Sequence, residues 1–198
     1  MADTIELPIF PLGSVLFPGG RLALRIFEPR YVAMTRAAMR GNTPFGVALI
    51  RAGYEVGRPA IPCDIGCTAR IVECSDVDAE TFALAAQGEA VFRIVSRETR
   101  PDGLIVAQVE LQEPPDPTPL PGHREPMAWL LQKLLGEIGE WQAPGPQRLQ
   151  DAAWVGNRLA ELLPVPPERK LALLELAAQP LVVLDRIAAI LQELRDQA

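Results

Sequence analysis

The stretch from Leu7 to Tyr31 constrains the fold more than any other part of the chain, because it fixes two strands, a turn and a helix start in order. A period of two in the apolar residues is typical of half-buried strands, and it is found at Ile5, Leu7, Ile9, Leu22, Leu24 and Ile26. Prolines and glycines between these runs predict a fixed turn. At Pro29 the period changes to that of a helix, which Gly41 ends.

The middle of the chain predicts further strands. Residues 45–50 form a short apolar run, and the polar loop at 53–62 is expected to border a binding surface. Four β-rich segments then follow, separated by turns at 76–80, 87–88 and 101–103: residues 63–74, 81–87, 89–97 and 104–111. Strands this short and closely spaced favour an antiparallel meander that closes into a barrel with few exposed edges.

The last third of the chain is predicted to be helical. Residues 113–122 hold five prolines in ten positions, so this segment should be extended, stiff and free of ladder hydrogen bonds. Beyond it, apolar residues recur at helical spacing in four segments punctuated by prolines. These segments are residues 127–138, 147–163, 167–178 and 180–194.

Five motifs carry a resemblance to a known family: LPIFPL, LFPGG, FEPRY, IGCTARIVEC and GEAVFRI. In order and spacing they resemble the N-terminal substrate-recognition domain of Lon proteases, and DAAWVGNRLAELLP is similar to the helical part of stand-alone bacterial proteins of this type. The resemblance implies an α+β fold, with a PUA-like antiparallel β-barrel, one inserted helix and a C-terminal α-helical bundle. We expect the barrel in residues 1–112, a Pro-rich linker in 113–123 and the helices in 124–198.

The chemistry of the full protease is not encoded here. The only lysines, Lys133 and Lys170, do not follow the glycines of a phosphate-binding loop, which argues against an ATPase of that class. Neither lysine is placed to activate a serine as a Ser-Lys peptidase requires. We therefore predict that the chain is not an enzyme and uses no cofactor.

Three cysteines and the single histidine are the candidate metal ligands of the sequence. Cys63, Cys67 and Cys74 have the spacing C-x3-C-x6-C, which is wider than the turn-borne pairs of structural zinc sites. On one strand, the odd offset of Cys67 and Cys74 predicts that they point to opposite faces. We expect small buried thiols, a solvated His123 and no metal.

Charge and composition limit the partners. A net charge of −6 provides no basic stripe for phosphates, so nucleic acid is not an expected partner and RNA binding would follow from fold analogy alone. Every apolar run is interrupted by charge before the ~20 residues of a membrane span. With an odd number of cysteines and no leader after Met1, the chain is expected to be cytoplasmic.

Two interpretations of the FEPRY region remain open. In the structural one, Glu28 lies at a helix N-terminus, Arg30 pairs with a neighbouring acid and Tyr31 packs on the barrel. In the functional one, the region lines a groove for an extended polypeptide, formed by Arg25, Phe27, Glu28, Arg30 and Tyr31.

The resemblance implies a non-catalytic module that binds unfolded or degron-bearing polypeptides. The alternative is an adaptor for one specific protein partner, as in cereblon, which carries a related domain. One departure from the family pattern favours a different partner, because Glu89, Ala90 and Val91 stand where Lon domains generally carry a basic residue before Phe-Arg-Ile. The sequence predicts no oligomeric state.

Overall fold

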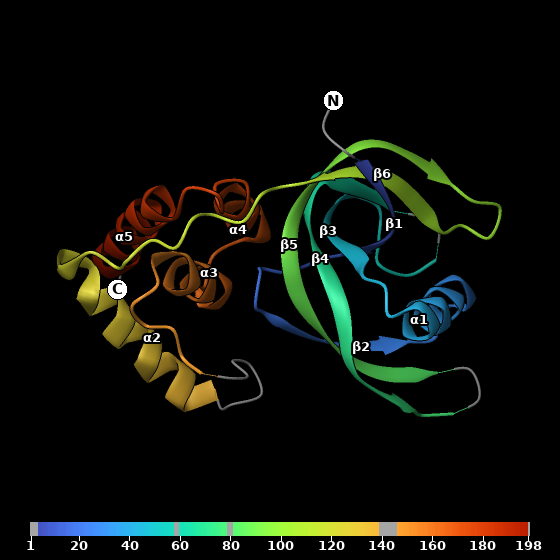
Figure 1. The fold of residues 1–198 in the computed structure, drawn as a ribbon, viewed down its shortest axis with the longest axis horizontal. Coiled ribbons are helices and arrows are strands. Elements are labelled where there is room, and N and C mark those ends of the chain that lie inside the picture. The colour runs from blue at the N-terminus through green and yellow to red at the C-terminus, as the bar shows by residue number, and fades with distance from the viewer. Residues whose placement is uncertain (1–3, 58–59, 79–80, 139–145, 198) are drawn as a thin grey trace.

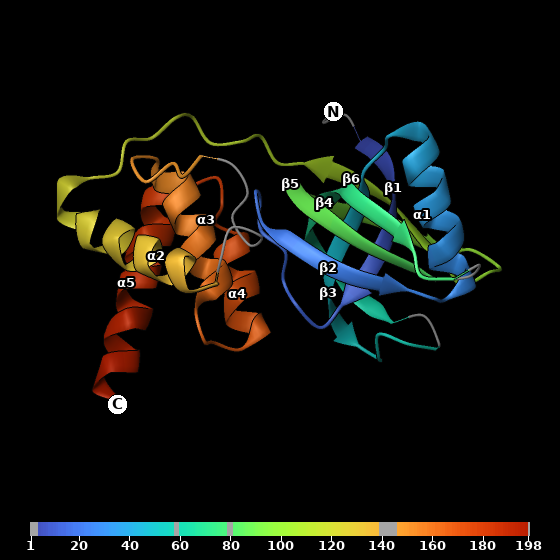
Figure 2. The same ribbon diagram turned by 90° about the horizontal axis from the view of Figure 1, so that it is seen from below.

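The computed structural model of the protein describes residues 4–57, 60–78, 81–138 and 146–197. Six strands form one sheet: β1 Thr4–Leu12, β2 Arg21–Ile26, β3 Phe45–Ala52, β4 Ile61–Asp76, β5 Phe82–Thr99 and β6 Ile105–Leu111. Five α-helices accompany it: α1 Pro29–Gly41, α2 Glu125–Ile138, α3 Ala152–Leu162, α4 Pro167–Leu174 and α5 Pro180–Asp196. A short 3-10 helix, η1, spans Gly122–Arg124. The α+β class is confirmed, with α1 beside the sheet and α2 to α5 together at its other side (Figures 1 and 2).

The sheet is mixed, so the expectation of an antiparallel arrangement throughout is wrong, whereas β4, β5 and β6 do form the antiparallel meander predicted for residues 63–111. β1 runs parallel to β3, with Ile9 opposite Gly46 and Leu12 opposite Leu49. Parallel neighbours need a long crossover, and here the chain between them contains β2 and α1. The other pairings are antiparallel, and β6 pairs with both β1 and β5. The pairings therefore run from β5 through β4, β3, β1 and β6 back to β5, while β2 is attached to the first half of β5.

The predicted turn at Gln87-Gly88 is also wrong, because β5 passes through it without a break. The backbone of β5 at Gly88 lies close to the backbone of the loop before β2. Its N–H donates to the carbonyl of Gly20 at 2.9 Å, and its own carbonyl accepts from Gly19 N–H at 2.7 Å. A Cβ on Gly88 would stand 2.3 Å from the carbonyl oxygen of Phe17, so only glycine fits here.

Cys67 and Cys74 face the same apolar cluster, contrary to the prediction from their odd spacing. The register between β4 and β5 shifts between Ile71 and Glu73, where β4 carries one residue more than its partner. A β-bulge of this kind inverts the alternation of side chains. The thiols are free in this structure, with Cys67 buried and Cys63 and Cys74 partly buried.

The helices share an apolar core that reaches into the sheet. Most of its buried residues come from α2, α3, α4 and α5, but Phe17, Ile65 and Val91 belong to the sheet part and pack in the same cluster. Phe17 is fully buried although it lies in the Pro/Gly-rich loop between β1 and β2. This loop therefore connects the two parts of the molecule.

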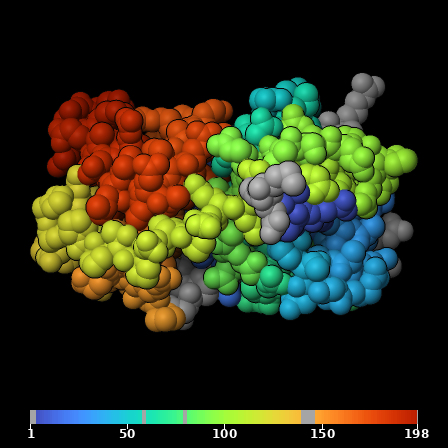
Figure 3. Space-filling view, turned by 45° about the horizontal axis from the view of Figure 1, so that its top comes forward, coloured from blue at the N-terminus to red at the C-terminus, as the bar shows by residue number. Residues whose placement is uncertain are grey.

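The Pro-rich segment is extended but not free of ladder hydrogen bonds, which corrects that prediction. Pro119 forms an isolated antiparallel bridge with Asp151, and Leu120 N–H donates to Gln150 at 2.8 Å. In Figure 3 the segment after β6, yellow-green, crosses the surface from the sheet to the helices. α3 begins at Ala152, later than predicted, because the Asp151 carboxylate accepts from the N–H groups of Ala153 and Trp154. α4 ends at Leu174, before the predicted position.

Candidate functional site

The outer edge of β2 is the open edge nearest the FEPRY region. β2 pairs with β5 from Arg21 opposite Gln87 to Ile26 opposite Phe82. No second strand in the described part of the chain pairs with it. An edge strand presents unpaired N–H and carbonyl groups, which form a template for another extended chain.

A cleft of about 230 Å³ lies along this strand. We call it the β2 cleft, and it is lined by Phe10, Leu12, Ala23, Leu24, Arg25, Ile26, Phe27, Glu28, Tyr31, Glu55 and Val56. Its apolar side chains include Phe27 and Val56, which are 50% and 57% exposed. Glu55 belongs to the polar loop that the sequence predicted as a border of a binding surface, and its carboxylate accepts from Gly13 N–H at 2.6 Å.

Four of the five predicted residues line this cleft, and Arg30 does not. The Arg30 side chain is only 7% exposed, and its Nη2 lies 2.7 Å from Oε2 of Glu28. Its guanidinium also stacks over the Tyr31 ring, 4.8 Å from the centroid. The Glu28 side chain makes no capping hydrogen bond, so its carboxylate balances Arg30 rather than the first turn of α1. Arg30 therefore does not line the cleft itself but contacts two residues that do, Glu28 and Tyr31.

Tyr31 forms part of the apolar wall. Its ring meets the Phe10 ring edge to face, with centroids 4.2 Å apart and an angle of 86°. Burial raises the pKa of Tyr31 above its ordinary value, so the phenol stays neutral at physiological pH. The ring is fixed on its inner side by Phe10 and by Arg30.

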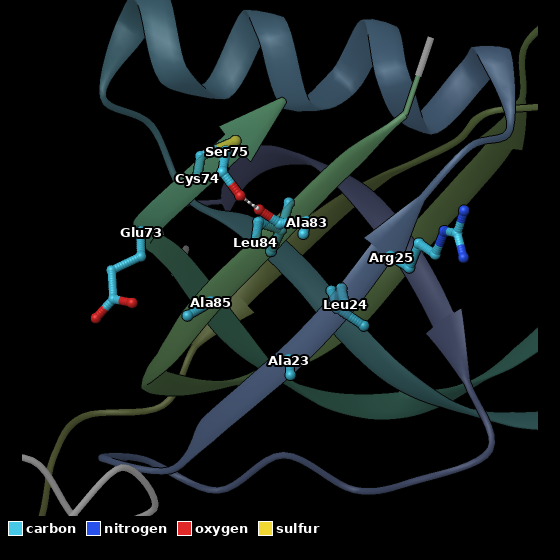
Figure 4. Close-up of a pocket in the computed structure, with 9 residues that line it drawn as sticks. All are labelled: Ala23, Leu24, Arg25, Glu73, Cys74, Ser75, Ala83, Leu84 and Ala85. Atoms are coloured by element: carbon cyan, nitrogen blue, oxygen red, sulfur yellow. Dashed lines mark hydrogen bonds between the residues drawn. The ribbon is translucent and has the colours of Figure 1, made fainter. Parts of the chain in front are cut away.

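A second hollow lies on the outer face of the sheet, across β2, β5 and β4 (Figure 4). We call it the alanine trough, because Ala83 and Ala85 on β5 form its centre. On one side it is flanked by Ala23 and Arg25 of β2, and on the other side by Glu73 and Ser75 of β4. It measures about 690 Å³ and is shallow. Arg25 is exposed, and no ion pair to it is found among the described residues. The free edge of β2 therefore lies beside one hollow on each face of the sheet.

The sequence predicted Arg25, Phe27, Glu28 and Tyr31 near this edge but missed Phe10, Val56 and the two alanines. The period of two includes Leu7 and Ile9 but not Phe10, so the sequence pattern gives no signal for Phe10. Alanines of a central strand give no sequence signal for a hollow, since only the longer side chains on both flanking strands create it.

The described residues contain no group of three or more His, Cys, Asp or Glu side chains placed to hold a metal ion. His123 is exposed in η1. In the same described part, no helix has the length and apolar character that a membrane span requires.

Comparisons with known proteins agree on one family. The family model described as "ATP-dependent protease La (LON) substrate-binding domain" matches residues 6–195. The crystal structure of a Lon N-terminal domain protein from Xanthomonas campestris is similar over 93% of this chain and 98% of that chain, with a TM-score of 0.78 and 34% identity. The N-terminal domain of a Mycobacterium avium complex Lon protease shares the fold, with a TM-score of 0.59, 16% identity and coverage of 93% and 98%.

Curated relatives match only in part. Lon protease 2 of Myxococcus xanthus is 36% identical over 91 residues, which is 45% of this chain and 11% of that protein. Cereblon of Danio rerio is 28% identical over 114 residues, which is 55% of this chain and 26% of cereblon. The matched part is thus about a tenth of the protease and a quarter of cereblon.

Proposed function

Because this chain belongs to the family of the LON substrate-binding domain, we propose that it is a non-catalytic module that binds polypeptides. The family match spans nearly all of the chain and concerns the substrate-binding domain alone. The ring of strand pairings supports a PUA-like barrel, and the shared core of α2 to α5 supports a helical bundle. We place the boundary between these two parts in the Pro-rich segment 113–123.

The free edge of β2 is the observation that carries this proposal. An extended segment of another protein adds to β2 as a further strand, because no strand in the described part of the chain pairs with the outer N–H and carbonyl groups of β2. Backbone hydrogen bonds of this kind depend little on side-chain identity, which suits a module that accepts many unfolded chains. The affinity is modest, since the bound segment loses conformational freedom.

The two hollows beside the edge supply the side-chain preference. Successive residues of an added strand point to opposite faces. One set of side chains meets the β2 cleft, where Phe27 and Val56 favour apolar residues. The other set lies beside Ala23 and Arg25, where the exposed guanidinium favours an acidic or polar residue. The preferred segment therefore alternates apolar and polar or acidic residues.

A fluorescence-anisotropy titration tests the binding function. The probe is a labelled small protein in two forms, one native and one reduced and alkylated so that it stays unfolded. We expect saturable binding of the unfolded form alone. Binding of both forms, or of neither, contradicts the proposal.

N-methylated peptides test the mode of binding. An N-methyl group removes one backbone N–H donor, and in a strand only every second N–H points to the neighbouring strand. When the methyl group is moved along the peptide, binding should therefore weaken at every second position and stay unchanged at the positions between. Arg25→Gln should weaken the binding of extended peptides that carry acidic residues. Arg40→Gln, which changes an exposed arginine on α1, is the matched control. A loss that is equal at all methylated positions would rule out strand addition.

The similarity to cereblon favours a second candidate, an adaptor that holds one specific protein. The breadth of binding separates the two. An adaptor ignores a panel of unrelated unfolded proteins and co-purifies with one partner at a fixed ratio, whereas a substrate-binding module accepts several members of the panel.

A further inference from the structure

A second cleft lies between two helices at the far side of the molecule from α1. Helices α2 and α5 both pack against α3, and they lie together at the end of the molecule that is opposite α1 (Figures 1 and 2). Residues at the start of α2 and in the second half of α5 line a cleft of about 460 Å³. We call it the α2–α5 cleft, and its lining residues are His123, Arg124, Pro126, Met127, Leu130, Ala188, Leu191 and Arg195.

The floor of the α2–α5 cleft is apolar. Met127 is buried in the helical core, and Leu130 and Leu191 are partly buried against that core, so each leaves part of its surface in the cleft. Ala188 stands one helical turn before Leu191 on α5 and has a short side chain that leaves room for a close approach. An apolar partner would gain by covering these side chains.

The rim of the cleft is positively charged, although the whole chain has a net charge of −6. Arg124 lies in η1, directly before α2, and Arg195 lies near the end of α5. Arg124 pairs with Asp185, which lies outside the lining. The guanidinium of Arg195 donates to the side chain of Gln192 and has no ion pair among the described residues. No Asp or Glu lines the cleft, so the rim attracts carboxylates.

The walls of the cleft select a helix as the occupant. Both walls are helices whose backbone groups are hydrogen-bonded internally, so neither presents an edge for an added strand. A helix that lies in the cleft contacts both α2 and α5, as neighbouring helices do in a bundle. A helix in that position packs its side chains into the grooves of α2 and α5.

We propose that the α2–α5 cleft binds an amphipathic helix of a partner protein, with carboxylates on both flanks of its apolar stripe. The stripe covers Met127, Leu130 and Leu191, and the carboxylates pair with Arg124 at one end of the cleft and Arg195 at the other. This surface is separate from the free edge of β2, and the inference does not rest on the proposed function.

A labelled peptide of about four helical turns tests the inference in an anisotropy titration. The probe has leucines at helical spacing flanked by glutamates. One control peptide replaces the glutamates with lysines, and a second carries a central proline that breaks the helix. We expect the glutamate peptide to bind in a salt-dependent manner and both controls to bind about tenfold more weakly or not at all.

Variants of the full chain locate the binding. Leu191→Gln and Arg195→Gln should each weaken the glutamate peptide, whereas Arg186→Gln, an exposed arginine on the same helix, should not. Circular dichroism confirms that each variant keeps its fold. Arg25→Gln at the β2 edge should leave this peptide unaffected, which separates the two surfaces.

Several results would overturn the inference. It fails if the glutamate peptide does not bind, if the lysine peptide binds equally well, or if Leu191→Gln has no effect in a folded variant. It also fails if sedimentation shows that the cleft is covered by a second copy of this chain and that Leu191→Gln separates the two copies.

Discussion

Replacing Arg158 with methionine should destabilise the protein by about 3 kcal/mol, because it removes one partner of a buried ion pair. The Arg158 side chain lies between the helices and the loop before β2 and is almost fully buried. Its guanidinium pairs with Glu161, and Nη2 donates to the carbonyl of Pro18 at 3.1 Å. Methionine keeps much of the volume but leaves the Glu161 carboxylate without its main counter-charge. The Glu161 side chain is 17% exposed, which holds the cost near the lower end of the ~3–5 kcal/mol typical of broken buried pairs.

The stability lost in the Arg158→Met variant should be smaller at low pH than at high pH. Burial raises the pKa of Glu161 above its ordinary value, while Arg158 and Lys170 oppose this shift. Without Arg158 the pKa of Glu161 rises further. A carboxyl whose pKa is raised on folding binds its proton more tightly in the folded state, so it lowers stability as the pH rises above its unfolded pKa. The variant should therefore lose less stability near pH 5, where Glu161 can protonate, than near pH 8.

Urea unfolding at these two pH values measures both effects. The double variant Arg158→Met with Glu161→Gln removes the carboxylate as well, and it should recover most of the lost free energy of unfolding. Arg186→Met, at an exposed site on α5, is the control and should change stability by less than about 0.5 kcal/mol. An equal loss at both pH values, or a double variant no more stable than the single one, would refute this reasoning.

Two further predictions concern the junction of the helices with the rest of the chain. Phe17→Ala should cost about 3–5 kcal/mol in urea unfolding, because it leaves a cavity in the core that the helices share with the sheet. Phe27→Ala, at a half-exposed phenylalanine, should cost about 1 kcal/mol or less, and similar losses for the two variants would contradict the assigned packing. Asp151→Ala removes the cap of α3 and should cost about 1 kcal/mol in the same assay, while Asp151→Ser should recover part of this loss; no recovery would argue against capping.

Local sequence patterns predicted the elements of this fold but not how they join. Apolar period and Pro/Gly punctuation located most strands, α1 and the C-terminal helices to within a few residues, because these signals depend on neighbouring residues, but they placed a false turn inside β5. The parallel pairing of β1 with β3 depends on the path of the intervening chain, which has no local signal. The register shift near Val72 likewise depends on how β4 meets β5, and it reversed the expected direction of Cys74.

The candidate site was predicted to a similar extent. The sequence pointed to the charged and aromatic residues around Pro29, but it left open whether they stabilise the start of α1 or line a groove for a polypeptide. The structure places Arg25 and Phe27 with exposed surface beside the free edge of β2, and it places Arg30 in a buried pair with Glu28. The packing of Tyr31 on Phe10 decides which side chains at the start of α1 face outward. Because these two residues are far apart in the sequence, local patterns do not predict this contact.

The pairing of β1 with β6 has a consequence for how the chain folds during synthesis. β1 leaves the ribosome well before β6, yet Thr4 pairs with Glu110 and Ile9 with Ile105. At ordinary rates of translation, the nascent chain waits on the order of 5–20 s before these partners are made. Throughout that delay the β1 edge is exposed and liable to pair with other chains. Translational pausing shortly before β6 should therefore increase misassembly of this protein more than pausing within the helices that follow.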